Sequence, residues 1–237
     1  MIRFFSFFFF TLFLFSCKHK TELLHAELKS FNIKVDFKLY SDSTYIVKSI
    51  YELDSIKNET LKGNYKLLND TLLCFGDFKF KGYLKNNFIE SNDEYEKYEI
   101  ISSKINSNQI IDFNKFPTYS TFTFRQSKEF NHFKNTVIPY ELTENDLYKI
   151  DSILPICMNK TGYFKEVKNT DNYSKQCIAI KNRNGETEVW VNCACSGIAK
   201  DSFKYFIGTV NDGGHCYFNL KINLTKKECF DVFVNGT

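Results

Sequence analysis

The feature that most constrains the fold is an alternation of apolar and polar residues with a period of two. Because successive side chains of a strand point to opposite faces, this pattern predicts strands with one buried face. It begins with Ile33, Val35, Phe37 and Leu39, which alternate with polar residues. Further short runs lie at 44–51, 61–68, 71–75, 78–84 and 88–90, and turn residues separate most of them. The spacing predicts an antiparallel β meander.

One helix is expected later in the chain. Thr143 can cap it, and Asp146 stands at the third helical position, as in a capping box. The helix would present one apolar stripe, made of Leu147, Ile150, Ile153 and Leu154. Pro155 lacks a backbone donor and should end or kink the helix near Leu154.

A strand-rich segment follows this helix. The pair Asn184-Gly185 lies between two alternating runs, which is a strong hairpin signal. A two-residue loop would pair Ile180 with Val189 and Ile178 with Val191, all on one face. Two more strands are expected at 216–224 and 229–234. The inner residues of the last strand would be Phe230, Val232 and Val234.

Together these patterns predict an α+β protein, in which the N-terminal antiparallel β meander is followed by a helix packed on a four-stranded antiparallel sheet. We expect two small domains. The predicted boundaries are a signal peptide at 1–16, a lipidated tether at 17–28, the β domain at 29–104, a linker and irregular segment at 105–141, and the α+β domain at 142–237.

The N-terminus carries a targeting signal. Arg3 supplies positive charge, and an apolar run from Phe4 to Phe15 is too short to span a membrane. The ending Leu14-Phe15-Ser16-Cys17 resembles the lipobox of bacterial lipoproteins, although Phe15 is bulkier than usual. The resemblance implies cleavage before Cys17, acylation of its thiol, and a partner membrane reached through that anchor. Lys18-His19-Lys20 has no acidic sorting residue, which favours the outer membrane. The alternative is an ordinary cleaved secretory peptide.

Charge argues against a nucleic-acid partner. The 237 residues carry 31 Lys and Arg against 28 Asp and Glu, a net charge of +3, with both signs interleaved throughout. Nucleic-acid binding normally requires a concentrated basic face. The chain also has no glycine-rich phosphate loop, serine elbow or HExxH spacing, and we expect no cofactor and no catalytic residues.

Cysteines offer the one cluster that could carry chemistry. Cys193, Cys195 and Cys216 would lie near the ends of adjacent strands, with His215 beside them. Three thiols and an imidazole would suit zinc. However, His215 and Cys216 are adjacent in one strand and point to opposite faces, so the strand cannot direct both at one ion. In an oxidising envelope we expect a disulfide from Cys216 to Cys193 or Cys195, with Cys195 preferred because it lies nearer the strand end. Metal or redox chemistry remains the alternative.

The C-terminal half carries a second resemblance. Glu188 to Cys195, Asp212 to Asn219 and the ending Val234-Asn235-Gly236 are similar to the tails of uncharacterised bacterial envelope proteins, a family with no activity to transfer. The expected function is that of a non-catalytic envelope lipoprotein with a binding, structural or inhibitor-like role, its partner an envelope protein. The alternative is a thiol- or zinc-dependent enzyme centred on Cys193, Cys195 and Cys216.

Overall fold

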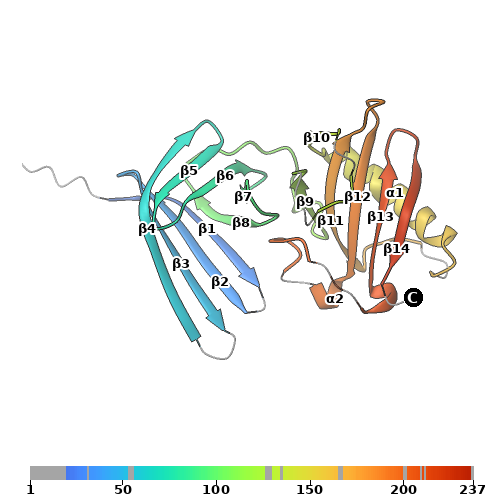
Figure 1. Cartoon of the computed structure of the whole chain (residues 1–237), viewed down its shortest axis with the longest axis horizontal. Coiled ribbons are helices and arrows are strands. Elements are labelled where there is room, and N and C mark those ends of the chain that lie inside the picture. The colour runs from blue at the N-terminus through green and yellow to red at the C-terminus, as the bar shows by residue number, and fades with distance from the viewer. Residues whose placement is uncertain are drawn as a thin grey trace, which may run out of the picture.

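The N-terminal part of the protein is a closed β-barrel. The computed structural model describes residues 20–30, 32–52, 56–125, 130–133, 136–164, 168–199, 202–208, 210 and 212–235. Each barrel strand runs antiparallel to the next, and the first strand pairs with the eighth (Figure 1). The strands are β1 (Glu22–Ser30), β2 (Ile33–Tyr40), β3 (Thr44–Glu52), β4 (Ile56–Leu68), β5 (Thr71–Gly76), β6 (Phe80–Lys85), β7 (Phe88–Ser91) and β8 (Lys97–Ser103). Closure leaves no unpaired edge in the cycle.

The barrel interior is a packed aromatic core. An eight-stranded barrel is just wide enough for its inward side chains to fill it. Phe37 lies at the centre, with its ring centroid 5.8 Å from that of Phe80 and 5.7 Å from that of Tyr98. The Tyr45 hydroxyl donates to the Phe78 carbonyl and accepts from the Phe78 amide, both at 2.9 Å. The interior therefore serves as a core, and a binding site must be sought elsewhere.

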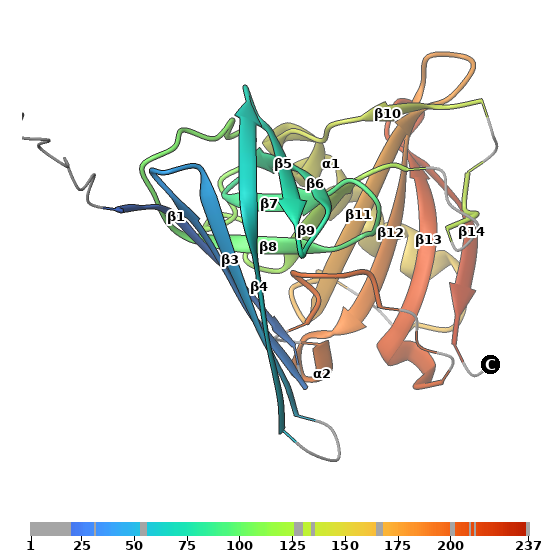
Figure 2. The same ribbon diagram turned by 60° about the vertical axis from the view of Figure 1, so that its left-hand side comes forward.

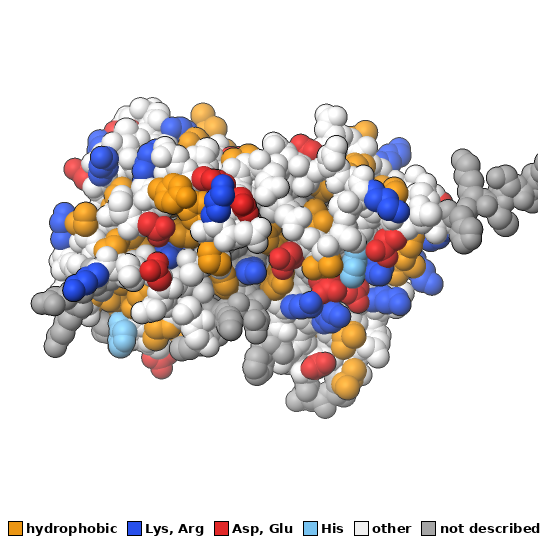
Figure 3. Space-filling model, turned by 180° about the vertical axis from the view of Figure 1, so that it is seen from behind, with side chains coloured by type: hydrophobic (Ala, Val, Ile, Leu, Met, Phe, Trp, Pro, Cys, Tyr) orange, Lys and Arg blue, Asp and Glu red, His pale blue; other side chains and the backbone are white. Residues whose placement is uncertain are grey.

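The second unit is a six-stranded sheet with a helix on one face (Figure 2). Its strands are β9 (Tyr119–Thr123), β10 (Ile138–Tyr140), β11 (Tyr173–Lys181), β12 (Thr187–Cys195), β13 (Tyr217–Asn223) and β14 (Glu228–Val234), and its helices are α1 (Glu144–Lys160), the short α2 (Ser196–Ala199) and a 3₁₀ turn, η1 (Gly214–Cys216). The apolar stripe of α1 packs against the inner residues of β11, β12, β13 and β14. On the outer surface, acidic and basic side chains are interleaved over both units (Figure 3). Within the described residues, no helix has the length and apolar character needed to cross a membrane.

The predicted α+β class is wrong, because the described part of the chain is mostly β, with eight barrel strands and six sheet strands against one long helix. The predicted architecture also differs in three respects. The meander is in fact a closed barrel, because residues 22–30, of which 22–28 were assigned to the tether, form β1 and pair with both β2 and β8. The second sheet has six strands and not four, since β9 and β10 both join β11. It is also mixed, because β9 runs parallel to β11.

The β11–β12 register also differs from the prediction. The loop spans 182–186 and is closed by the Asn182 side chain, whose Oδ1 accepts from the amides of Asn184 and Glu186. Consequently Ile178 lies opposite Trp190 and Ala179 opposite Val189. A one-residue slip moves side chains to the other face of a strand. Ile178 and Ile180 therefore join Trp190 on the face away from α1, while Val189 and Val191 face the helix.

In the last strand, β14, the alternation of core-facing and outward-facing side chains reverses at Asp231. This residue adopts a left-handed backbone conformation, with φ of 50°, and the pairing with β13 shifts register there. Such a bulge reverses which side chains face the core. Val232 and Val234 contact the core as predicted, but Phe230 does not, and Cys229 takes the inner position.

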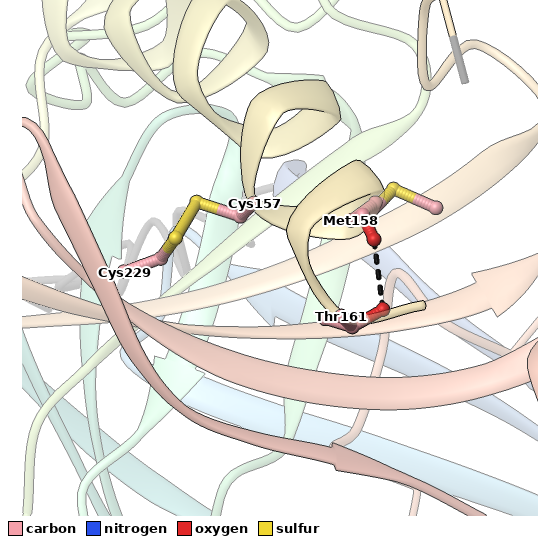
Figure 4. Close-up of a disulfide and its surroundings, with 4 residues drawn as sticks. All are labelled: Cys157, Met158, Thr161 and Cys229. Atoms are coloured by element: carbon pink, nitrogen blue, oxygen red, sulfur yellow. Dashed lines mark hydrogen bonds between the residues drawn. A yellow bond between two sulfur atoms is a disulfide. The ribbon is translucent and has the colours of Figure 1, made fainter. Parts of the chain in front are cut away.

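Helix α1 begins as predicted and ends later. The Thr143 hydroxyl accepts from the Asp146 amide, and the Asp146 carboxylate accepts from the Thr143 amide, which completes the capping box. The helix continues through Pro155 to Lys160 and ends where the Thr161 hydroxyl donates to the Met158 carbonyl. This extra turn carries Cys157, which forms a disulfide with Cys229 across a Cα–Cα distance of 5.9 Å (Figure 4).

A buried ionic network joins the barrel to the sheet. The Glu90 carboxylate is 1% exposed and forms ion pairs of 2.9 Å with both Lys85 and Arg125. Burial disfavours its charge, but these two cations hold the pKa of Glu90 below its ordinary value. Lys97 on β8 is also buried, and its ammonium donates to the Thr121 carbonyl at 3.1 Å. Because the partners belong to both units, the network fixes one unit against the other.

Candidate functional site: a cleft on the open face of the second sheet

The face of the second sheet opposite α1 carries a cleft of about 530 Å³. Its floor is a row of side chains from neighbouring strands: Gln176 on β11 pairs with Asn192 on β12, which pairs with Asn219 on β13, which pairs with Phe233 on β14. Antiparallel pairing places directly opposed residues side by side on one face. Three amides and an exposed phenylalanine therefore cross the sheet in a single line.

Backbone from the segment 202–208 forms one wall and orients the amides. The Gln176 Nε2 donates to the carbonyls of Phe203 at 2.7 Å and Phe206 at 2.6 Å. The Asn192 Nδ2 donates to the Gln176 Oε1 at 2.9 Å and to the Gly208 carbonyl at 3.1 Å. These bonds fix both side chains, so the Asn192 carbonyl oxygen has a defined direction.

A stacked aromatic pair also lines the cleft. The His132 imidazole lies on the Trp190 indole with ring centroids 4.5 Å apart and planes inclined by 23°. The Trp190 Nε1 donates to the Asn219 Oδ1 at 3.2 Å, which directs the Asn219 Nδ2 away from the indole. Partial burial, and to a lesser degree the charge of Lys221, lowers the pKa of His132. This shift favours the neutral form of the imidazole.

The cleft is close to electrically neutral. Of its ionisable lining residues, Lys221 and Asp231 form an ion pair of 2.8 Å with each other. Phe233 is 61% exposed and Val210 is 40% exposed, so apolar surface remains at the rim. The arrangement suits a ligand with neutral hydrogen-bonding groups and at least one apolar group.

The predicted cluster of Cys193, Cys195 and Cys216 lies at one end of this cleft. Two of its cysteines are bonded to each other and the third is not. Cys195 and Cys216 form a disulfide with a Cα–Cα distance of 4.8 Å, which is the pairing that the sequence analysis preferred. Their neighbours Ala194 and Tyr217 line the cleft. Cys193 remains a free thiol that is fully buried on the helix side, and burial raises its pKa to about 12.

The remaining predicted positions take no part in the cleft. His215 lies in the turn η1, and it does not line the cleft. Cys17, the predicted lipidation site, lies outside the described residues. Sequence reasoning missed the amide row because its alignment depends on the registers of three strand pairs. The sequence carried only part of the signal: Asn192 and Asn219 have the parity of outward positions, whereas Gln176 has the parity of Ile178 and Ile180, which were predicted to face inward.

Comparison with known proteins gave no relatives. No protein-family model matches the chain, no curated protein matches it, and no solved structure matches it.

Proposed function

We propose that this protein is a lipid-anchored envelope protein that binds a peptide segment of an envelope partner in the cleft of its second sheet, without catalysing a reaction. The observation that carries the proposal is the row of Gln176, Asn192 and Asn219 beside exposed Phe233. Amide side chains supply both donors and acceptors, as a peptide backbone does. An apolar rim beside such a floor can receive one apolar side chain.

The neutrality of the cleft supports a peptide backbone over a charged ligand. A carboxylate or phosphate is normally held by an unpaired cation, preferably arginine. Lys221 is engaged by Asp231, and no arginine lines the cleft within the described residues. A neutral segment would keep that ion pair intact.

Two observations favour binding over catalysis. A hydrolytic serine needs a base within hydrogen-bond reach. Ser174 and Ser202 line the cleft with His132, yet in the described part of the chain the imidazole contacts aromatic rings and donates to neither hydroxyl. The thiol alternative needs an accessible thiolate. Cys193 is buried with a raised pKa, and the other two cysteines are bonded to each other.

Membrane anchoring at Cys17 is the second part of the proposal. It rests on the apolar leader and its lipobox-like ending. Detergent-extracted protein should give an intact mass for a chain that starts at Cys17 and carries acyl groups. A Cys17→Ala variant that still partitions with membranes to the same extent would contradict the anchor.

The cleft can be tested by photo-crosslinking in intact cells. A photoreactive phenylalanine analogue at position 233 should form crosslinks to peptides of one envelope protein, identified by mass spectrometry. The same analogue at Phe75, an exposed phenylalanine on the barrel, serves as the matched control. Equal crosslinking from both positions would contradict the site.

A blocking variant sharpens this test. Gly208 lines the cleft, and a Cβ atom built there meets no atom within 4 Å, so the backbone at this position can carry a side chain and Gly208→Trp is designed to fill the cleft. Gly197 on α2 is equally open but does not line the cleft, so Gly197→Trp is its control. We expect Gly208→Trp to abolish the crosslinks from position 233 and Gly197→Trp to preserve them. Undiminished crosslinking in the Gly208 variant would refute binding in the cleft.

A further inference from the structure

The outer wall of the barrel brings a histidine and two carboxylates together. His25 and Glu27 point outward from β1, and Asp36 lies directly opposite Glu27 on β2. The His25 Nε2 is 3.5 Å from a Glu27 oxygen and 3.4 Å from an Asp36 oxygen, and the three ligand atoms lie within 4.8 Å of one another. Figure 3 shows a histidine among acidic and basic side chains on the barrel half of the molecule.

These distances are long for hydrogen bonds and suitable for metal ligands. A charge-assisted hydrogen bond between nitrogen and a carboxylate is about 2.7–2.9 Å. Ligands held about 2.1 Å from a tetrahedral zinc ion are instead separated by about 3.4 Å. An imidazolium shared by the two carboxylates is the alternative reading, and it would draw the Nε2 closer to one oxygen. At 3.4 Å the contact between the His25 Nε2 and the Asp36 Oδ1 is a long hydrogen bond, and an ion shared by the three side chains would replace it.

A second observation points to a missing cation. Glu27 lies opposite Asp36 on one side and opposite Glu99 on β8 on the other, so three carboxylates form a row across adjacent strands. Like charges directly opposed on a sheet are destabilising. Glu27 is also nine-tenths buried, which increases the cost of its charge.

The neighbouring lysines compensate this row only in part. The exposed Lys29 ammonium contacts the Glu27 Oε2, an atom that otherwise accepts no hydrogen bond, and Glu27 Oε1 remains directed toward His25. Lys34 is 3.9 Å from Asp36. The Glu99 carboxylate accepts a hydrogen bond from the Tyr205 hydroxyl, which supplies no charge.

We propose that His25, Glu27 and Asp36 bind a divalent transition-metal ion of the zinc type. Nitrogen and oxygen donors in this combination suit zinc, and three protein ligands leave a fourth position for water or a ligand from outside the chain. Both strands belong to the closed barrel, so the ligands are held on a rigid wall. The site lies on the other unit from the peptide cleft and does not depend on the function proposed for it.

To test this site, the full chain is purified in detergent and stripped of metal. Zinc is then titrated into it in the presence of a competing chelator, and binding is measured by calorimetry. We expect saturable binding of one ion per chain. His25→Ala and Asp36→Asn should each weaken the affinity by at least about 10–100-fold, the loss that even outer-shell changes can cause. His215→Ala, at a histidine far along the chain from the cluster, should leave the affinity unchanged. Circular dichroism of each variant checks folding, and the isosteric His25→Gln replaces His25→Ala if the latter does not fold.

One variant changes the affinity in the opposite direction. Lys29→Ala removes a cation that competes for Glu27, so it should tighten zinc binding. X-ray absorption of the zinc-loaded protein should show nitrogen and oxygen ligands at about 2.0–2.2 Å. Absence of saturable binding, or equal affinity in the wild-type protein and in the His25 and Asp36 variants, would overturn the site.

Discussion

Replacement of the buried Lys97 by methionine should remove a specific pH dependence of stability. Desolvation lowers the pKa of Lys97 from 10.5 to about 7 in the folded protein, although nearby Glu90 opposes the shift. Above pH 7 the folded chain loses this proton while the unfolded chain keeps it up to about pH 10.5. Stability must therefore rise with pH across this window. At about 1.4 kcal/mol per pH unit, the full window corresponds to about 5 kcal/mol, and the interval from pH 6.5 to 8.5 to about 2 kcal/mol.

The aromatic surroundings of Lys97 explain why methionine is the suitable replacement. Its ammonium lies 4.2 Å from the ring centroid of Phe88 and 4.5 Å from that of Phe122. A thioether packs well against such rings and fills a similar volume. The variant loses the hydrogen bond to Thr121, which shifts its stability by an amount that does not vary with pH.

The measurement is urea unfolding of both proteins at pH 6.5 and 8.5, followed by far-UV circular dichroism. The stability difference between them should change by about 2 kcal/mol in favour of the wild-type protein as the pH rises. Lys66→Met, at an exposed lysine of β4, serves as control and should show no such change. If the Lys97 variant keeps the full pH dependence of the wild-type protein, then the buried ammonium is not its cause.

Two further predictions concern the cysteines. Paired serine replacement of Cys195 and Cys216, which close a loop of 21 residues, should lower the unfolding free energy by about 3 kcal/mol, and replacement of Cys157 and Cys229, which close 72, by about 4 kcal/mol. Urea titrations followed by the fluorescence of Trp190 measure both, and the reverse order of losses would contradict the loop-entropy argument. Cys74 and Cys193, whose pKa values burial raises to about 12, should resist alkylation by iodoacetamide at pH 8 until the protein is denatured. Rapid native alkylation of Cys193 would instead support the thiol-enzyme alternative.

Local patterns in the sequence predicted most strands of the barrel, but they could not predict its closure. Closure depends on β1 pairing with β8, where Leu24 lies opposite Ser103. Hydrophobic periodicity describes a local segment, so it cannot predict a contact between residues so far apart in the sequence. The alternation of Leu24, Ala26 and Leu28 is present in the sequence, but these residues were assigned to a polar tether.

One error in the predicted register separated two residues of the cleft floor. The signal Asn184-Gly185 favours a two-residue loop, but Asn182 closes a five-residue loop with its side chain. Under the predicted register, Gln176 and Asn192 would not be opposed, whereas they are direct partners in the sheet. The prediction that Cys216 pairs with Cys195 and not with Cys193 required only that the ends of two strands lie close together. Such a local argument is less sensitive to register than the assembly of a row across four strands.

The two disulfides are nested, which bears on how the protein matures. The ring closed by Cys157 and Cys229 contains the smaller ring closed by Cys195 and Cys216, together with the buried thiols of Cys177 and Cys193. If the chain is exported from its N-terminus, as the proposed envelope location requires, Cys157 meets four other cysteines before its native partner appears. Oxidants that join consecutive cysteines would therefore trap wrong pairs, and thiol exchange would be needed to release them. We expect the yield of correctly bonded protein to fall when export proceeds without a disulfide isomerase, as non-reducing peptide mapping would measure.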